Sequence, residues 1–378
     1  NKSASFASNA DAKVSPLKPY KDLPSNLTDI LDDPSTIDPS QSTQDVLDRF
    51  NLVLKDLGDS GYVKNSVSIN APLLPLFFNS DLLGGSVGIG VSVNAQAGLT
   101  VLDDTLEYNN QNGSFSTATS IYLKTGIEKT VALSYSREVP VGSWLKSHGT
   151  LYAGTKLKAM NIELSKQLLP LETLDSDDIS DIITDEYDNN LKSTTEFGID
   201  VGVVWDADSY RIGLTAENLN SPEFEYGDLG VNCASITQNT PQRTTCEAAA
   251  YFSQVKGEIE AQEVYTKHAF VRADVLLKLT ERWQLTSAMD LAEYDDVIGF
   301  ENQWLHAATS YDAASWWIPS ARVGYHKNLA GTETSSATFG FTLFSLALDF
   351  EYGLDTTEVD GDKVPRRVGF ALSIEESF

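Results

Sequence analysis

Apolar residues alternate with small, polar or charged residues along the last third of the chain. The alternation is strict in four consecutive segments, near 317–327, 335–343, 345–352 and 367–375. A period of two predicts β-strands that each have one apolar face. A soluble β-sandwich alternates in the same way. Here the second face carries Gly and Ala as often as charge, and aromatic residues gather near strand ends, which favours a membrane barrel with a crowded polar lumen.

The same pattern predicts fourteen strands, an even number, as in single-chain bacterial membrane barrels. They lie near 63–70, 86–97, 116–125, 128–138, 150–163, 194–205, 209–218, 266–279, 282–291, 302–312, 317–327, 335–343, 345–352 and 367–375. Short turns at 206–209, 280–281 and 344 contrast with long links at 164–193, 219–265 and 353–366. The predicted fold class is therefore all-β, a 14-stranded antiparallel transmembrane β-barrel over residues 63–378 with long outer loops. A long link at 98–115, where a short turn is expected, fits poorly.

Residues 1–62 do not fit the strand pattern. Prolines interrupt the first forty residues, and an amphipathic helix is predicted to begin at Thr43 and to end before Gly58. A 14-stranded barrel is wide enough to conduct water or to need filling. We therefore expect 1–62 to form an N-terminal plug, with a periplasmic segment that carries one short helix as the alternative.

Composition narrows the function classes. Acids outnumber bases by 54 to 27, which gives a net charge of −27 and argues against nucleic acid as a partner. Four His and two Cys exclude a Cys-rich zinc site, and no sequence feature indicates a cofactor or a metal. No stretch approaches the roughly 18 apolar residues of a membrane helix, while barrel strands escape that test by alternation.

Two features of the long links suggest local chemistry. Cys233 and Cys246 enclose twelve residues in the longest link, and in an oxidising envelope they are expected to form a disulfide. The link from Glu172 to Asp188 holds eight acids and no base. It is either a solvated acidic loop or a set of oxygen ligands for Ca²⁺ or for ions that bridge to lipopolysaccharide.

Charged residues on the non-apolar face of the predicted strands are expected to point into the lumen. The candidates are Asp200, Arg211, Arg272, Asp274, Asp290, Arg322, Asp349 and Glu351, together with Lys156, Lys158, Glu217 and His326. Because buried charges are costly without partners, we expect extensive pairing among them. They either close the lumen or line a polar channel. Phe378, after the last predicted strand, is the candidate C-terminal assembly signal.

Catalysis has little support in the sequence. Four histidines and many serines are present, but no Gly-x-Ser-x-Gly motif occurs. A hydrolase would need Ser or Asp beside His at the outer face of the membrane. The expectation is that the protein is not an enzyme.

Several segments resemble a known family. They are Gly213–Phe224 with its Asn218-Leu-Asn-Ser-Pro222 element, Ser193–Trp205, and Asp290-Leu-Ala-Glu with Ala321–Ala330. Over about residues 60–378 the chain resembles the conjugal-transfer TraF-like outer-membrane proteins, a branch of the FadL-like long-chain fatty-acid transporter barrels. The thioredoxin-like protein that shares the TraF name is different, since no Cys-x-x-Cys exists here. The resemblance implies fourteen strands, an N-terminal plug, and passage of hydrophobic compounds through a greasy pocket, a kinked strand and a lateral opening. The family's Gly/Ala-rich stretch and Asn-Pro-Ala element are absent from 1–62.

Two functions are therefore expected for a protein of the bacterial outer membrane. The first is a passive channel for hydrophobic or amphipathic small molecules, with an apolar pocket below 71–84, 164–193 and 219–265. The second is a plugged structural or interaction barrel of the envelope, in a conjugation- or surface-related assembly, with no continuous path and large ordered outer loops. The expected partners are outer-membrane lipid and lipopolysaccharide, a hydrophobic small-molecule ligand, and the barrel-assembly machinery through the C-terminal strand.

Overall fold

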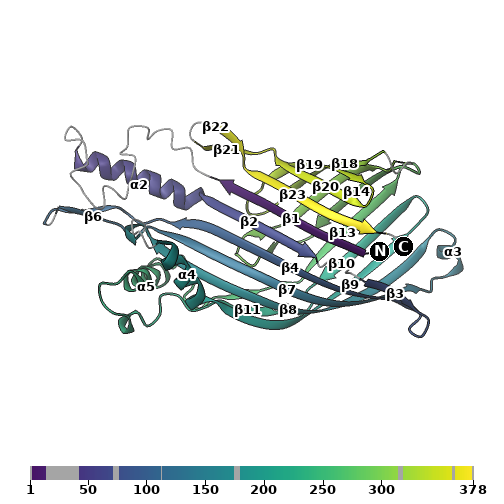
Figure 1. Ribbon diagram of the computed structural model, residues 1–378, viewed down its shortest axis with the longest axis horizontal. Helices are drawn as coiled ribbons and strands as arrows, with labels where there is room; N and C mark the ends of the chain where they lie inside the picture. The colour runs from purple at the N-terminus through teal and green to yellow at the C-terminus, as the bar shows by residue number, and fades with distance from the viewer. Residues whose placement is uncertain are drawn as a thin grey trace.

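One closed antiparallel sheet dominates the computed structural model, which describes residues 2–13, 42–70, 76–111, 113–173, 179–313, 318–359 and 362–376 (Figure 1). Fourteen strands form the barrel: β1 (Lys2–Lys13), β2 (Tyr62–Asn70), β4 (Gly85–Leu102), β7 (Ser120–Val139), β8 (Thr150–Pro170), β9 (Lys192–Asp206), β10 (Tyr210–Glu217), β13 (Phe270–Lys278), β14 (Trp283–Asp290), β17 (Trp304–Tyr311), β18 (Ser320–Asn328), β19 (Ser335–Leu343), β20 (Leu346–Gly353) and β23 (Arg367–Glu376). The ring closes because β2 pairs with both β1 and β4, and β1 pairs with β23. The predicted fold class and strand count are confirmed.

The remaining elements are short, apart from the helices of the long connections. The strands are β3 (Leu76–Ser80), β5 (Glu107–Asn109), β6 (Ser114–Ser116), β11 (Glu223–Glu225), β12 (Val264–Thr266), β15 (Tyr294–Asp295), β16 (Glu301–Asn302), β21 (Thr356–Val359) and β22 (Asp362–Pro365). The helices are α2 (Thr43–Ser60), α3 (Ser143–Lys146), α4 (Ile179–Asn190) and α5 (Pro241–Tyr251), with single turns η3 (Leu171–Thr173), η4 (Cys233–Ser235) and η5 (Phe252–Lys256). None of the described helices is long and apolar enough to cross a membrane.

The two ends of the barrel differ in the length of their connections. Both chain ends and the short turns lie at one end, while α2, α4, α5 and the long connections lie at the other (Figure 1). In membrane barrels the short turns are periplasmic and the long loops are outside. The β3–β4 turn lies at the periplasmic end. Strands β3 and β4 form a hairpin there, and the residue pair next to its turn is Ser80 with Gly85. The prediction of an outer loop over 71–84 is therefore wrong.

The prediction that 1–62 forms a plug or a periplasmic segment is wrong for the described part. Residues 2–13 are barrel strand β1, paired on both sides. Its lipid-facing positions carry one large apolar residue, Phe6, among Ala and Ser, so the alternation is weak in sequence. Helix α2 lies at the outer end rather than in the lumen. Residues 14–41 are outside the described residues, as is Phe378.

The count of fourteen strands is right although two assignments behind it are wrong. The segments 116–125 and 128–138 form one continuous strand, β7, and β1 supplies the missing member. With β1 counted, the long link after β4 falls at the outer end with the other long connections. The poor fit at 98–115 therefore disappears.

An apolar belt surrounds the barrel where the strands pass through the membrane. Its outer edge includes Phe197, Leu219, Leu291 and Leu354, which are about half or more exposed. Just beyond this edge the outward side chains become polar, as in the Lys129–Glu163 ion pair. Strand β9 needs nine residues, 197–205, to cross the belt, which matches the roughly 9–11 residues of a spanning strand.

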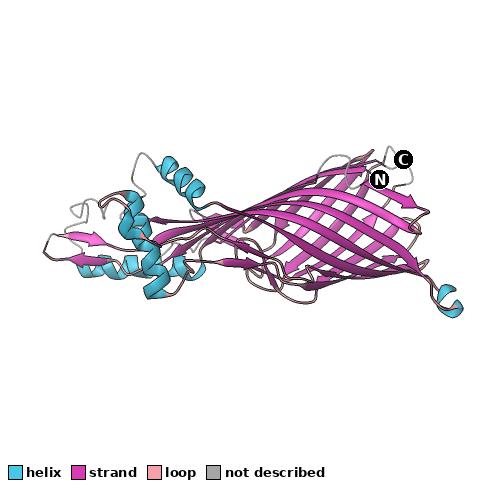
Figure 2. Cartoon of the chain, turned by 90° about the horizontal axis from the view of Figure 1, so that it is seen from below, coloured by secondary structure: helices cyan, strands magenta, loops and turns pink. Residues whose placement is uncertain are grey.

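Three strands continue far beyond the belt. Strands β4, β7 and β8 have 18, 20 and 21 residues, whereas β10 and β14 have eight. At about 3.3 Å per residue, the extra length raises a wall roughly 30 Å above the membrane. We call this wall, with α2, α4, α5, the β5–β6 hairpin and the paired strands β11 and β12, the outer lobe (Figure 2).

Helices cover the outer lobe on more than one side. Helix α2 begins at Ser42, whose hydroxyl accepts a hydrogen bond from Asp45 N at 3.1 Å, and its buried stripe contains Val46, Phe50 and Leu54. This stripe packs against the β5–β6 hairpin. The segment that continues from α5 buries Phe252 against the inner face of β8. The outer lobe therefore has its own hydrophobic core.

Candidate functional site: the barrel lumen

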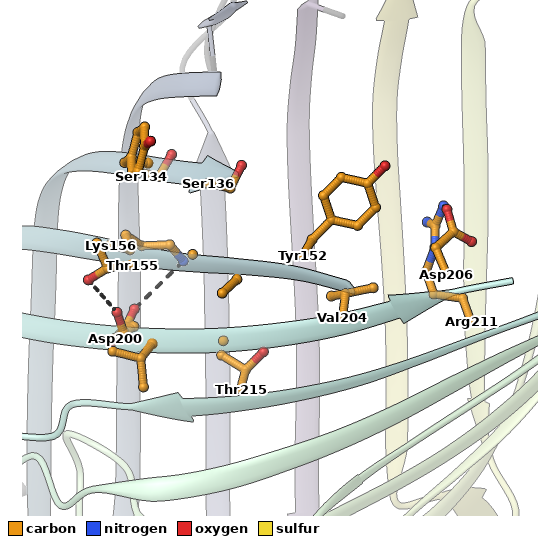
Figure 3. Close-up of a pocket in the computed structure, with 15 residues that line it drawn as sticks. Ser134, Ser136, Tyr152, Thr155, Lys156, Asp200, Val204, Asp206, Arg211 and Thr215 are labelled. Carbon is orange, nitrogen blue, oxygen red and sulfur yellow. Dashed lines mark hydrogen bonds and ion pairs between the residues drawn. The ribbon is translucent and has the colours of Figure 1, made fainter. Parts of the chain in front are cut away.

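A large cavity of the lumen lies in its periplasmic half, against strands β7, β8, β9 and β10. Its volume is about 580 Å³, within the range of small-molecule sites (Figure 3). Space exists here because Gly154 and Gly202 have no side chain on the inner face and Ser134 and Ser136 have short ones. Tyr152 and Val204 add apolar surface to the lining.

Charged side chains at the cavity are already paired with one another. Asp200 is buried and lies 2.7 Å from Lys158 Nζ and 3.7 Å from Lys156 Nζ. Arg211 donates to Asp206 across the β9–β10 turn at 2.9 Å. The cavity therefore offers polar groups and apolar surface together, with its charges largely neutralised in place.

A second cavity of about 260 Å³ adjoins the first and shares Ser134 and Lys156 with it. It lies where the strand that pairs with β4 is discontinuous. Asn70 of β2 pairs with Ser92 of β4, and Leu76 of β3 pairs with Ile89 of β4. The chain therefore advances six positions from β2 to β3 while β4 advances only three. Such a surplus interrupts the ladder. Phe77, which is 59% exposed, borders this cavity above Gly88.

The Asn218-Leu-Asn-Ser-Pro222 element forms a tight, hydrogen-bonded turn at the outer edge of the apolar belt. Asn218 and Ser221 have positive φ angles of 53° and 44°. Asn218 is buried, its backbone donates to Asp200 at 2.9 Å, and its side chain accepts from Lys158 at 2.6 Å. Asn220 accepts from the backbone of Ile199. The element thus satisfies two buried charges, which explains this residue pattern in structural terms.

The opposite wall, from β13 to β23, is crossed by ion pairs. Arg272 donates to Asp290 at 2.7 Å, and Arg322 binds Asp349 through two nitrogens. His326 contacts Glu351 at 2.8 Å, and Arg367 also contacts that carboxylate. Two glycines make room for such side chains, because a Cβ atom at Gly340 or Gly213 would collide with Asp349 or Asp274.

The eight charged residues predicted for the lumen all lie on the face opposite the exposed apolar side chains. Asp200 and Arg211 are at the large cavity, and five of the others form the pairs of the opposite wall. Asp274 stands over Gly213 near Arg211. The structure brings them together in separate groups rather than in one cluster.

A hairpin that the sequence reading missed fills the outer mouth of the lumen. It comprises β15, β16 and the turn between them, residues 294–302. Val297, Ile298 and Phe300 reach the far wall, where a Cβ atom at Gly98 of β4 would lie 2.9 Å from Ile298 and from Phe300. Lys64 of β2 forms a buried ion pair with Asp296. In the sequence, the apolar run Val297-Ile-Gly-Phe300 between acidic residues is the signal that could have indicated this hairpin.

Contacts from the outer lobe hold the hairpin in place. Tyr226 donates to the backbone oxygen of Val297, and Tyr265 donates to that of Asp295 at 3.2 Å. Burial raises the pKa of Tyr226, so its hydroxyl stays protonated and remains a donor. Asp296 accepts from the backbone of Ile298 and Phe300 and so shapes the turn.

The outer connections account for the remaining candidates. Cys233 and Cys246 form a disulfide that ties η4 to α5. Among the residues that the structure describes, no group of three or more His, Cys, Asp or Glu is arranged to hold a metal ion. Part of the acidic link, 174–178, lies outside the described residues. A serine–histidine contact, Ser147 to His148 at 3.0 Å, lies at the periplasmic end and not at the outer face required by the hydrolase hypothesis.

These features define the class of protein: a 14-stranded outer-membrane β-barrel with an outer lobe. A family model described as "F plasmid transfer operon, TraF, protein" matches residues 6–290. The chain belongs to that family, which confirms the resemblance to the TraF-like proteins. No curated protein matches the sequence.

Solved structures with a similar fold include the TodX monoaromatic hydrocarbon channel deltaS2 mutant, at 9% identity and a TM-score of 0.43, covering 98% of this chain and 87% of that one. The Ralstonia pickettii toluene transporter TbuX has 9% identity and a TM-score of 0.38, covering 98% and 88%. A Pseudomonas aeruginosa FadL homologue has 11% identity and a TM-score of 0.37, covering 98% and 89%.

Proposed function

We propose that the protein is a passive outer-membrane channel for small amphipathic molecules. The observation that carries this proposal is the cavity of about 580 Å³ in the lumen, whose lining joins apolar surface from Tyr152 and Val204 to polar groups such as Lys156. A ligand with one apolar and one hydrogen-bonding part satisfies both. Phe77 extends the apolar surface into the adjoining cavity.

Wholly apolar ligands fit less well than amphipathic ones. The sequence predicts an apolar pocket below the connections 164–193 and 219–265. In the structure, packed side chains of the outer lobe fill that space, among them Leu164, Leu168 and Phe252. Open volume lies lower in the barrel, where hydroxyl groups and charges share the surface. The proposal therefore keeps the channel and shifts the ligand class toward molecules with a polar part.

Flux into proteoliposomes tests the proposal. The probe is 4-nitrophenyl β-glucoside, a neutral amphipathic molecule, and trapped β-glucosidase releases coloured nitrophenolate as the probe enters. We expect flux above that of empty vesicles for the wild type and a reduction for Gly202→Leu, which fills the cavity from the inner face. A Cβ atom at Gly202 makes only ordinary contacts, so the barrel should tolerate the change.

The matched control is Gly142→Leu, at a periplasmic position where a Cβ atom meets nothing within 4 Å. Its flux should equal that of the wild type. Wild-type flux no greater than that of empty vesicles, or equal flux in Gly202→Leu and the wild type, would reject the cavity as a ligand path.

A second candidate function is an interaction platform on the outer lobe. The observation in its favour is charge: from residue 43 onward, the connections at the outer end carry 31 acidic and seven basic residues. Such a surface attracts a basic partner over a distance. Photo-crosslinking in cells from Val255, which is 71% exposed on the lobe, should capture one basic envelope protein, whereas Leu82 at the periplasmic end should not capture it.

A further inference from the structure

Three cavities touch strand β4 between the outer mouth and the periplasmic half, and a fourth adjoins the last of them against β7 to β10. The first, about 510 Å³, includes Thr100 in its lining, and the second, about 210 Å³, includes Gln96. The third, about 260 Å³, includes Ser92 and Gly90, and it adjoins the cavity of about 580 Å³. Strand β4 therefore contributes to the lining of three successive cavities, the last of which opens beside the cavity of about 580 Å³.

The wall at β4 carries short, neutral side chains along its inner face. On β4 these are Gln96, Asn94, Ser92 and Gly90, with Ser66 and Ser68 beside them on β2 and Thr130 and Ser134 on β7. The opposite wall is filled by long side chains that pair across it, as Arg322 does with Asp349. The short side chains leave room at the third cavity, whereas the second cavity is also lined by the paired charges of Glu128 and Lys267.

The hairpin 294–302 separates the first cavity from the second. Phe300 lines the outer cavity, whereas Asp296 and Val297 line the one below. Between them, Ile298 and Phe300 lie over Gly98, where the wall itself has no side chain. Apolar side chains packed on glycine therefore lie between the first and second cavities, beside the Lys64–Asp296 ion pair.

We propose that the inner face of β4 is the solute route of this barrel and that Ile298 and Phe300 over Gly98 form its selectivity constriction, which admits small neutral solutes and excludes ions. This inference rests on the proposed channel function and adds the route, the selecting residues and the charge class. Along the inner face of β4, the hydroxyl and amide groups of the side chains replace part of the water around a neutral solute. An ion would lose its hydration at apolar side chains, with nearby charges already paired.

The first test opens the constriction. The double variant Ile298→Ala with Phe300→Ala is compared with the wild type in the vesicle assay, with 4-nitrophenyl β-glucoside as the neutral probe. The corresponding β-glucuronide, of similar size but with a carboxylate, is read with trapped β-glucuronidase. We expect the wild type to pass the glucoside and to discriminate against the glucuronide, and the variant to pass both, with a rise of roughly tenfold for the anion.

The second test closes the constriction with a covalent link between the hairpin and β4. A Cβ atom at Gly98 would lie 3.5 Å from the Cβ of Ile298, within the span of a disulfide. The variant Gly98→Cys with Ile298→Cys should lose glucoside flux when oxidised and recover it in dithiothreitol. Wild-type protein with and without dithiothreitol controls for reduction of the native disulfide, and Lys129→Met removes an exposed ion pair outside the lumen as a matched surface control.

The outcomes separate this inference from the proposed function. If neither the wild type nor the opened variant passes either probe, the channel itself is rejected. If the wild type passes glucoside but the opened and locked variants match it for both probes, the channel stands and the constriction is overturned. Should the opened variant fail to fold, as judged by heat modifiability, the locked variant decides alone, because its flux must depend on the redox state.

Discussion

The two walls of the lumen are built on opposite principles. From β13 to β23 the strands are short and long charged side chains pair across the inner face. Along β4, from Gly90 to Gln96, the inner face is small and neutral, and this strand continues with β7 and β8 into the outer lobe. Paired charges fill space and fix the shape of a wall, whereas short side chains leave a path. The comparison teaches that one wall provides rigidity and the other provides room.

The largest expected effect comes from the charged wall. Arg367 and Glu351 are well shielded from solvent, and Arg367 also lies near Asp11. Arg367→Met leaves a buried carboxylate without its cation, so we expect a loss of roughly 3–5 kcal/mol in the free energy of unfolding, measured in urea with lipid vesicles. Adding Glu351→Gln should restore part of it. By contrast, Ser66→Ala on the neutral wall should change little, and equal losses at both sites would remove the distinction between the walls.

The next effect sharpens the boundary between the barrel and the outer lobe. Replacing Cys233 and Cys246 by Ser removes a link across 13 positions and should cost about 3 kcal/mol on the loop-entropy model. The loss should be local, with faster proteolysis in α5 and unchanged heat modifiability of the barrel. Ser235→Ala, within η4, is the control. Loss of heat modifiability would mean that the lobe and the barrel unfold together.

A smaller effect is expected at Asn218, at the outer edge of the apolar belt. Asn218→Ala loses the hydrogen bond to Lys158 and places a Cβ-bearing residue without a polar side chain at positive φ. We expect about 2 kcal/mol of destabilisation in the same urea assay. Asn218→Gly keeps the backbone conformation but not the side chain, so it should lose less. If the two variants are equal, the backbone conformation contributes nothing.

The smallest effect concerns pH and the outer lobe. Burial alone would raise the pKa of Asp104, but hydrogen bonds from Lys256 and Tyr251 outweigh it and lower that pKa, and the Lys256 pKa rises in turn. The pair's contribution is present above the unfolded Asp pKa of about 4 and is lost as pH falls through the lower folded value; at the alkaline end it is lost above about pH 10. Because both groups are partly solvated, Asp104→Asn should weaken the lobe by only about 0.5 kcal/mol at pH 7.

Protease resistance of the lobe at pH 7 and pH 3 measures this difference. The difference between the wild type and Asp104→Asn should become smaller at the lower pH, because the contribution of the ionised Asp104 is lost as the pH falls through its lowered pKa. A difference of the same size at both values would assign the effect to packing rather than to charge.

Sequence periodicity was sufficient for most of the barrel but not for its contents. Strands such as β20 were predictable because Leu348 and Phe350 face lipid and Asp349 faces inward, so period two is strong. Strand β1 was not, because Ala and Ser on its outer face resemble a loop. The charged residues were placed by alternation, but their partners depend on register between strands distant in sequence. Nothing local showed that 294–302 turns inward, since its contacts with Lys64 and Gly98 come from the far wall.

The pairing of β1 with β23 also has a consequence for how the molecule is made. Residues such as Phe6 and Leu372 lie side by side across this seam, although nearly the whole chain separates them. The cylinder therefore cannot be sealed until β23 has been synthesised. A polypeptide that stops short of it leaves a bare edge on β1, which is open to pairing with another chain. Closure of the barrel thus depends on both β1 and β23 being present in the same chain.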